Sequence, residues 1–318
     1  MLHLNWEKKG RIFDPSATTD WNYEYAQVPW AIEFDDYLRV YFTSRPPVDS
    51  KGQYVSYTFY ADFDKADMSR MITVSDNPVM GLGELGCFDE FGTMPCSVIK
   101  RDDIGEVWMY YVGWTRKVTV PYDCAIGLAI SKDGGKTFSK YSNGPILASS
   151  TKNPFLLGCP RVYWFNNKWH MWYLGGTDWV TNGEKAESIY HLKLATSANG
   201  IDWDLVQDDV VPKKYENECQ TCASIFEYGG MYHMYFTYRH GIDFRNPERG
   251  YRIGYAFSKD LKTWERNDEI GSIDPSSEGW DSEMICYPSI IKVQEKVIMF
   301  HCGNYFGKSG FGYAELSN

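Results

Sequence analysis

The chain has 318 residues and a formal net charge of −10, which disfavours nucleic acid as a main partner because phosphate binding needs a basic surface. Its first residues lack the basic and apolar segments of a secretory signal, and no stretch approaches the roughly 18 consecutive apolar residues of a membrane span. We therefore expect a cytoplasmic protein with no membrane partner, whose eight cysteines are reduced thiols.

A short motif recurs along the chain at a spacing of about 65 residues. In each copy one residue leads into a short apolar run, and these five leading residues are Pro29, Pro95, Pro160, Ala223 and Pro288. Four copies carry a glutamate five positions earlier, at Glu24, Glu90, Glu218 and Glu283, whereas the third copy has Phe155 there. The chain therefore reads as five repeats of one structural unit.

Each unit reads as a set of short strands rich in aromatic and β-branched residues. The units cover about 27–75, 93–142, 158–206, 221–267 and 286–316. In the second unit, the expected strands cover 94–100, 107–114, 125–131 and 138–141. The fifth unit shows only three strands, at 287–293, 296–302 and 311–316.

An additional strand is expected near the N-terminus, at about 2–9. It resembles the segments that end other units, so it is well placed to supply the missing fourth strand of the fifth unit. Such pairing would close a ring and remove exposed sheet edges. The sequence therefore predicts an all-β, five-bladed β-propeller of four-stranded antiparallel blades, forming a single domain over 1–318.

Between the third and fourth expected strands, three units carry related turns beginning at Ser131, Ser197 and Ser258. They resemble Asp-box turns, in which an acidic or amide side chain bonds the turn backbone and an aromatic residue anchors it. We interpret them as structural markers of the repeat.

The connectivity of such blades places the long loops and the repeated glutamates on one face of the propeller. These loops cover 45–54, 114–124, 176–188, 239–250 and 303–310. A ring of carboxylates there could support acid–base chemistry, since neighbouring carboxylates shift one another's pKa and glycoside hydrolysis uses a pair of them. The catalytic candidates are Glu24, Asp89, Glu90, Glu218 and Glu283. Alternatively, the glutamates bond backbone amides where the inner strands begin.

Other polar and aromatic residues are expected on the same face. Arg45 and Arg239 occupy matching positions, sixteen residues after their leading residues, and arginine can hold hydroxyl, carboxylate or phosphate groups. Trp21 and Trp280 also match, each three residues before its glutamate. The substrate-binding candidates are Gln27, Arg45, Arg161, Arg239, His240, Asp281, Trp21, Trp114 and Trp280.

No metal or cofactor is predicted. One Cys-x-x-Cys pair, Cys219 and Cys222, has no second pair to complete a zinc site. His240 and His301 are expected near strand ends on the face that carries the long loops, which we call the working face. A divalent cation on the axis is therefore an open alternative, but no ligand spacing indicates one.

Several sequence segments of the expected blades carry a family resemblance that covers almost the whole chain. They are the segments 108–114 (WMYYVGW), 126–131 (IGLAIS), 251–256 (YRIGYA) and 279–288 (GWDSEMICYP). With them the sequence resembles the five-bladed propeller glycosidase superfamily, the furanosidase-like clan of arabinanases, xylosidases and invertases, and above all its uncharacterised glycosidase-related members. The resemblance implies a glycoside hydrolase-like enzyme that acts on a glycosidic bond or an activated sugar in the central funnel.

The chain departs from the family pattern at the blade entrances. The family places an aspartate before the proline that opens the first blade, but here Val28 precedes Pro29, and Cys159 precedes Pro160. Glu218 and Glu283 fit the position of the family's acid, and the base would come from Glu24, Asp89 or Glu90. Transglycosylation, phosphorolysis, another sugar modification, and non-catalytic binding of a glycan or a protein are the alternatives. The oligomeric state is not predicted.

Overall fold

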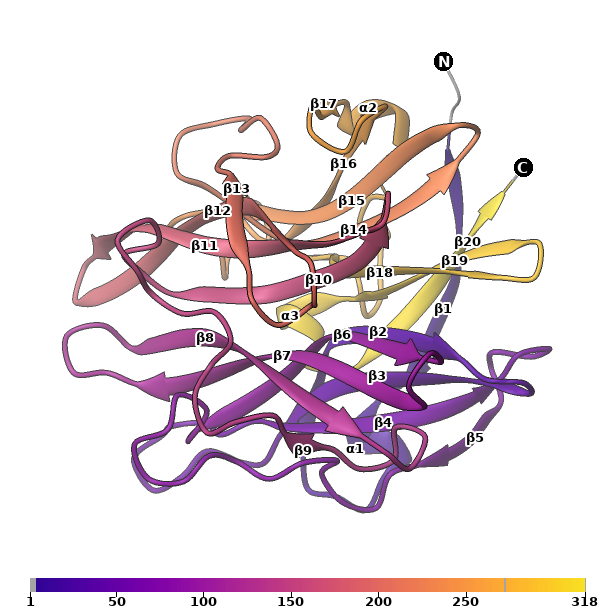
Figure 1. Cartoon of the computed structure of the whole chain (residues 1–318), viewed down its shortest axis with the longest axis horizontal. Coiled ribbons are helices and arrows are strands. Elements are labelled where there is room, and N and C mark those ends of the chain that lie inside the picture. Colours follow the sequence, from indigo (N-terminus) through magenta and orange to yellow (C-terminus); the bar gives the residue numbers. More distant parts are fainter. Residues whose placement is uncertain (1–3, 272, 318) are drawn as a thin grey trace.

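The computed structural model describes residues 4–271 and 273–317, and within them twenty strands form five antiparallel sheets of four strands each (Figure 1). The innermost strands contact one another in the closed order β2, β6, β10, β14, β18 and back to β2. The five sheets are thus the blades of a propeller around a central axis, which confirms the predicted all-β, five-bladed fold.

The first three blades follow the chain in order. Blade 1 consists of β2 (Glu24–Glu33), β3 (Tyr37–Arg45), β4 (Tyr57–Asp64) and β5 (Met71–Val74). Blade 2 consists of β6 (Gly92–Arg101), β7 (Glu106–Arg116), β8 (Tyr122–Ser131) and β9 (Ser139–Lys140). Blade 3 consists of β10 (Leu157–Phe165), β11 (Lys168–Asn182), β12 (Lys185–Ser197) and β13 (Asp204–Gln207).

The last two blades complete the ring. Blade 4 consists of β14 (Glu218–Tyr228), β15 (Met231–His240), β16 (Arg252–Ser258) and β17 (Glu265–Arg266). Blade 5 combines β18 (Cys286–Val293), β19 (Lys296–Cys302) and β20 (Phe311–Ser317) with β1 (Asn5–Phe13). The described helices are single turns: α1 (Pro15–Thr18), α2 (Asp268–Gly271) and α3 (Asn304–Gly307). Among the described residues, no helix is long and apolar enough to cross a membrane.

Blade 5 joins the two ends of the chain. Strand β1 pairs antiparallel with β20, from Asn5 opposite Ser317 to Phe13 opposite Phe311, and the two strands lie side by side in Figure 1. The predicted closure is confirmed, although the first two residues of the expected strand at 2–9 lie outside the described residues. Because the outer edge strand of blade 5 comes from the N-terminus, the ring is held shut by main-chain hydrogen bonds.

Aromatic side chains fill the space between neighbouring blades. At the closing junction, the ring of Phe13 lies 4.7 Å from that of Phe42 in blade 1 and 5.3 Å from that of Phe311. The middle strands are buried on both faces, so they read as continuous apolar runs rather than alternating patterns. Burial of these large rings is the main favourable term in blade association.

The turns expected to mark the repeat also connect adjacent blades. The Asp133 carboxylate accepts hydrogen bonds from the backbone amides of Lys136 and Thr137, both at 3.0 Å. The hydroxyl of Tyr41 in blade 1 donates to the Gly135 carbonyl of the same turn at 2.7 Å. Tyr110 of blade 2 makes the matching bond to Gly200 of blade 3 at 2.9 Å. These two turns therefore tether blades 2 and 3 to the blade that precedes each of them.

Two details of the predicted elements are wrong. The segment 176–188, expected as a loop, is mostly a hairpin in which β11 and β12 stay paired out to Asn182 and Lys185. The glutamates of the first and fourth repeats, which precede the expected units at 27–75 and 221–267, are the first residues of β2 and β14. Both differences arise because strand pairing continues past the apolar core, where the sequence carries no hydrophobic signal.

Candidate functional site

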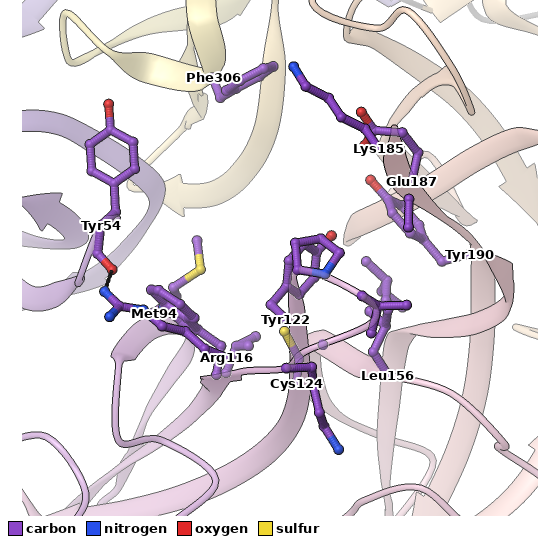
Figure 2. A pocket seen from close by; sticks show the side chains of 18 of the residues that line it. Tyr54, Met94, Arg116, Tyr122, Cys124, Leu156, Lys185, Glu187, Tyr190 and Phe306 are labelled. Carbon is purple, nitrogen blue, oxygen red and sulfur yellow. Dashed lines mark hydrogen bonds between the residues drawn. The ribbon is translucent and has the colours of Figure 1, made fainter. Parts of the chain in front are cut away.

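A cavity of about 780 Å³ lies at the end of the propeller where the inner strands begin (Figure 2). Every blade contributes to its wall from its innermost strand, through Gln27, Met94, Cys159, Thr221 and Tyr287. All five loop regions predicted for the working face contribute as well, so the cavity is the axial funnel. We call it the axial cavity.

The inner strands share an irregular backbone where they meet the axial cavity. Each of β2, β6, β10, β14 and β18 has a register shift against its neighbour at this level. In four of them the residue before the leading residue has a left-handed backbone, with φ of 55° at Val28, 46° at Cys159, 52° at Cys222 and 57° at Tyr287. This conformation is unfavourable for residues with a Cβ and is typical of bulges beside functional sites.

Three of the sequence-predicted site residues line the axial cavity: Gln27, Arg45 and Trp114. The Gln27 amide donates to the Phe306 carbonyl at 2.9 Å, while its carbonyl oxygen is buried and has no partner among the described residues. The Trp114 indole donates to the Ser56 hydroxyl at 2.8 Å, which fixes the ring at the wall. The cavity therefore offers a buried hydrogen-bond acceptor, a guanidinium and an anchored indole.

Glu218 does not reach the axial cavity. Its side chain is completely buried in blade 4, where it accepts hydrogen bonds from the Arg266 guanidinium at 2.7 Å, the Lys214 amide at 2.8 Å and the Gln220 side chain at 2.9 Å. These three contacts occupy the carboxylate, so it acts as a structural clamp between the inner and outer strands of its blade.

Asp89 and Glu90 lie in the connection between blades 1 and 2. Asp89 is almost completely buried, accepts from the Tyr111 hydroxyl at 2.9 Å and pairs with Lys140 at 2.6 Å. The Glu90 carboxylate accepts from the Gly86 amide at 3.0 Å. Both carboxylates therefore hold the connecting loop, and neither belongs to the wall of the axial cavity.

Glu24 and Glu283 also lie off the axis. Glu24 is exposed and 3.4 Å from the Lys308 ammonium. Glu283 is partly buried, with one carboxylate oxygen lacking a hydrogen-bond partner among the described residues, and it does not line the axial cavity. The five candidate carboxylates do not line the axial cavity as expected, and four of them, Glu24, Asp89, Glu90 and Glu218, are held by local contacts at their blade entrances.

The two other predicted arginines are enclosed by carbonyl and hydroxyl oxygens. Arg161 is fully buried and donates to the carbonyls of Cys96 at 2.7 Å and Pro288 at 3.4 Å, which lie on two other blades. Arg239 donates to the Tyr190 hydroxyl at 2.9 Å and lies 3.8 Å from the centre of the Phe244 ring. Arg239 therefore contacts two residues of the cavity wall, Tyr190 and Phe244, without lining the cavity itself.

The remaining predicted residues pack elsewhere. The His240 ring stacks on Tyr215 at 4.0 Å, and Trp21 packs on Phe59 at 4.1 Å. In blade 5, Asp281 pairs with Lys8 at 2.7 Å, and Trp280 stacks on the buried ring of His301 at 5.2 Å. None of His240, Trp21, Asp281 and Trp280 lines the axial cavity.

Most of the aromatic wall was not identified from the sequence. It consists of Tyr54, Tyr122, Tyr190, Phe244, Tyr251, Tyr287 and Phe306. Figure 2 shows Tyr54, Tyr122, Tyr190 and Phe306 around the hollow from different sides. One signal was available: Cys159 and Tyr287 both come directly before a leading residue, so comparing that position between repeats would have pointed to the axis.

The acidic residues of the wall were also missed. They are Glu184 and Glu187, on the hairpin of β11 and β12. Glu187 is buried and pairs with Arg245 at 2.7 Å, whereas Glu184 is exposed at the hairpin tip. In Figure 2, Glu187 and Lys185 extend from the same side of the hollow. Their hairpin lay in a segment expected as a loop, which gave no reason to single out one residue.

The wall is rich in groups that stay protonated at neutral pH. Burial raises the pKa of Tyr122, Tyr190 and Tyr287, so their hydroxyls remain hydrogen-bond donors. Burial also raises the pKa of the Cys124 thiol, which makes it a poor nucleophile. Within the described residues, no group of three His, Cys, Asp or Glu side chains is placed to hold a metal ion.

A second hollow, of about 980 Å³, lies at the opposite end of the axis, where the inner strands finish. Its wall is largely apolar, with Trp30, Val98, Val162, Ile225 and Ile290 contributed by the five blades. Its charged residues include Lys100, Lys292 and Arg101, of which Arg101 pairs with Asp103. The axial cavity combines a ring-lined wall with the Gln27 carbonyl oxygen and the Arg45 guanidinium, both unpaired among the described residues, so it is the better candidate for a functional site.

Two proteins of Mycobacterium tuberculosis are similar to this chain over its length. The uncharacterized protein MT1551 of strain CDC 1551 / Oshkosh is 33% identical over 99% of this chain and 100% of its own length. The uncharacterized protein Rv1502 of strain H37Rv is 32% identical over the same shares. The chain matches no model of a known protein family.

Solved structures share the fold at low sequence identity. A structure named as a glycoside hydrolase has a TM-score of 0.74 and 19% identity, and the match covers 98% of this chain and 92% of that one. A putative glycosidase from Bacteroides thetaiotaomicron has a TM-score of 0.69 and 18% identity over 98% of this chain and 96% of its own.

A third structure represents the GH130 family of mannoside phosphorylases, which contains glycoside hydrolases that target β-1,2 mannosidic linkages. It has a TM-score of 0.68 and 15% identity, over 99% of this chain and 94% of its own. These likenesses establish the fold that the chain shares with five-bladed propeller glycoside hydrolases. By sequence, the chain belongs to the family of the uncharacterized mycobacterial proteins MT1551 and Rv1502.

Proposed function

We propose that this protein is a carbohydrate-active propeller that binds a saccharide in the axial cavity and acts there on a glycosidic bond or an activated sugar. The observation that carries the proposal is the composition of the wall, in which rings from several blades surround a few fixed polar groups. Apolar aromatic faces with a small number of oriented polar groups are typical of small-molecule sites. The fold shared with glycoside hydrolases supports the same assignment.

The wall suits a sugar ring in particular. Trp114 and Tyr54 offer flat apolar surfaces for the C–H face of a pyranose or furanose. The buried carbonyl oxygen of Gln27 has no partner among the described residues, so it would accept a hydrogen bond from a sugar hydroxyl. Leaving this acceptor unpaired costs free energy, and a bound hydroxyl would remove that cost.

We assign the proton transfer of this reaction to Glu187. Standard glycoside hydrolysis needs two carboxyl groups about 5 to 10 Å apart on either side of the scissile bond. The five carboxylates expected from the sequence lie outside the wall, and the acidic residues of the wall, Glu184 and Glu187, share one hairpin. Glu187 is the buried member of this pair and lies beside the tyrosine-lined part of the cavity.

The test is a screen of oligosaccharides, aryl glycosides and activated sugars, with binding followed by calorimetry and products by chromatography. Wild-type protein should turn over at least one compound, and Glu187→Gln should lower kcat about 100-fold or more, the usual contribution of general acid–base catalysis. Glu24→Gln, at an exposed carboxylate outside the cavity, is the matched control and should retain full activity. Absence of both binding and turnover across the panel would reject the assignment.

A second candidate function is saccharide binding without catalysis. It is favoured by the structural contacts that occupy Glu218, Asp89 and Glu90. This function predicts saturable binding with no product, and Glu187→Gln would bind the same sugar with little change. Trp114→Ala would weaken binding about tenfold under either function, because both use the same wall.

We also infer that the protein works in a reducing compartment such as the cytoplasm. All eight cysteines are free thiols, although several lie close together around the axis. Free buried thiols are typical of proteins kept reduced. Thiol titration of freshly purified protein should find eight reactive groups after denaturation without a reductant, and a lower number would contradict this inference.

A further inference from the structure

The Arg45 guanidinium lies at the wall of the axial cavity without a counter-charge. It is partly buried at the end of β3, and its Nε atom is buried with no hydrogen-bond partner in the described part of the chain. Among residues 4–271 and 273–317, no carboxylate forms an ion pair with it. Its cross-strand neighbour Glu24 is directed instead to Lys308, at 3.4 Å.

Tyrosine rings surround this cation. The guanidinium carbon lies 5.0 Å from the centre of the Tyr25 ring and 5.2 Å from that of Tyr54. Tyr251 and Tyr287 are also close enough to affect its charge, but burial is the larger effect and lowers the pKa of Arg45. A neutral tyrosine cage offers weak cation–π attraction and does not replace the hydration that the guanidinium has lost.

Other buried arginines of this chain have the partners that Arg45 lacks. Arg39 makes two hydrogen bonds of 2.8 Å to the Asp62 carboxylate. Arg161 and Arg239 donate to backbone carbonyls, and Arg266 pairs with Glu218. Each of these four guanidinium groups has at least one hydrogen-bond acceptor, although the Nε atom of Arg161 also lacks one. Arg45 differs from them because, among the described residues, its side chain forms no hydrogen bond or ion pair and lines the axial cavity.

Most other cations of the wall already have a counter-charge. Arg116 pairs with Asp49 at 3.3 Å, Lys117 with Asp123 at 3.1 Å and Arg245 with Glu187 at 2.7 Å. Among the described residues, Arg45 and Lys185 are the cations of the wall that form no ion pair. An anionic ligand would therefore supply the counter-charge that Arg45 lacks.

From these contacts we propose that the ligand of the axial cavity is a saccharide with an anionic group, a carboxylate or a phosphate, that pairs with Arg45. The proposal rests on the proposed function and names its substrate class. The planar guanidinium would bind either oxyanion through two parallel hydrogen bonds. The unpaired carbonyl oxygen of Gln27 would accept from a hydroxyl of the same sugar.

The experiment compares matched sugars that differ in charge. Binding is measured by calorimetry at low and high salt for galacturonate against galactose, and for glucose 1-phosphate and mannose 1-phosphate against glucose and mannose. Acetate and inorganic phosphate alone test whether a free anion suffices. The proteins are wild type, Arg45→Gln, Arg45→Lys and the control Arg70→Gln, which changes an exposed arginine on the outside of blade 1.

We expect at least one acidic sugar to bind about tenfold or more tightly than its neutral counterpart, with the difference reduced by salt. Arg45→Gln should weaken this binding about 10- to 100-fold, Arg45→Lys should retain part of it, and Arg70→Gln all of it. Without ligand, Arg45→Gln should unfold at the same temperature as wild type or higher, since an unpaired buried charge is removed. This last measurement also shows that the variant folds.

The contrary results separate the two proposals. If neutral sugars bind as tightly as acidic ones, the anionic substrate class is wrong and the carbohydrate function stands. If free phosphate binds through Arg45 and no sugar does, the cavity is an anion site and the carbohydrate function is wrong. If neither sugar nor anion binds, both proposals are wrong. A marked loss of stability in ligand-free Arg45→Gln would show a structural role and would also reject the substrate class.

Discussion

The carboxylate of Glu218 lies 2.7 Å from the guanidinium of Arg266, and both side chains are sealed inside blade 4. The pair joins the first residue of the innermost strand to the last residue of the outermost one. A glutamate that repeats at the entrance of four blades is thus, in this blade, part of the internal framework. Arg266 also pairs with Asp268 at 3.1 Å, whereas Arg266 is the ion-pair partner of Glu218 among the described residues.

Glu218→Ala should destabilise the protein by about 2 to 4 kcal/mol, because it removes the acceptor of three donors, those of Arg266, Lys214 and Gln220, while Asp268 still pairs with Arg266. Glu24→Ala, at the equivalent position of blade 1, should change stability by less than about 1 kcal/mol, because its pair with Lys308 is exposed. Urea unfolding followed by tryptophan fluorescence measures both. Equal stability losses in the two variants would mean that burial does not distinguish them.

Arg161→Leu should lower the free energy of unfolding by about 2 to 4 kcal/mol, because it removes the donor for two buried carbonyls, those of Cys96 and Pro288. These carbonyls belong to blades 2 and 5, so the substitution also loosens contacts across the axis. Arg70→Leu, at an exposed arginine, is the control and should be close to neutral. Thermal unfolding that leaves Arg161→Leu as stable as the control would exclude this bridging role.

His301→Phe should flatten the pH dependence of stability between about pH 6.5 and pH 4. Burial is the main effect on His301 and lowers its pKa to about 4, although the Asp281 carboxylate acts to raise it. The unfolded chain, with a pKa near 6.5, binds the proton more readily than the folded chain in this range. Wild-type stability should therefore fall as the pH is lowered from 6.5 to 4.

The measurement for His301 is the urea midpoint at pH 7, 6, 5 and 4.5 for both proteins. Phenylalanine keeps a ring against Trp280, so the packing is preserved while the titrating group is removed. His170→Phe removes a less buried histidine of blade 3, whose pKa burial also lowers, and so measures what a half-exposed histidine contributes to the slope. A pH slope that is unchanged in His301→Phe would mean that other groups cause it.

The double substitution Asp133→Asn with Asp260→Asn should make the fold less sensitive to acid between about pH 4 and pH 2. For Asp133, partial burial acts to raise the pKa, but hydrogen bonds from Ser131, Thr137 and Lys136 outweigh it and lower the pKa to about 2. For Asp260, backbone hydrogen bonds from Thr263 and Lys262 have the same result, also about 2.

A carboxylate with a lowered pKa stabilises the fold above its unfolded value, near 3.8, and this contribution is lost as the pH falls towards 2. Asparagine is tolerated in this turn, because Asn199 occupies the same position in blade 3. Melting temperatures between pH 5 and pH 2 should fall less steeply for the double variant than for wild type. Parallel curves would show that these turns do not contribute to acid sensitivity.

The fold could be predicted because each blade repeats a local pattern of apolar strands and turns. The spacing of Pro29, Pro95, Pro160, Ala223 and Pro288 is enough to give the number of blades and their common orientation. Ring closure could be predicted because the fifth unit lacks a fourth strand and an additional strand, at about 2–9, precedes the first unit. These features depend on which strands pair, and the apolar pattern largely determines pairing.

The site could be predicted only as far as its face and its loops. Arg45 and Arg239 occupy matching positions in their repeats, yet Arg45 faces the axial cavity unpaired. Arg239 is enclosed, because the hairpin of blade 3 places the Ser188 carbonyl and the Tyr190 hydroxyl beside it. Such contacts come from loops that differ between repeats, so equivalent positions in the sequence do not have equivalent partners.

The pairing of β1 with β20 has a consequence for the order in which the protein folds. Asn5 finds its partner Ser317 only after more than 300 further residues have been joined to the chain. Of the described strands, β1 is synthesised first and pairs with β20, which is synthesised last, so its edge stays open while blades 1 to 4 assemble. Because blade 5 supplies one side of the axial cavity, the cavity is completed only when the two ends of the chain meet.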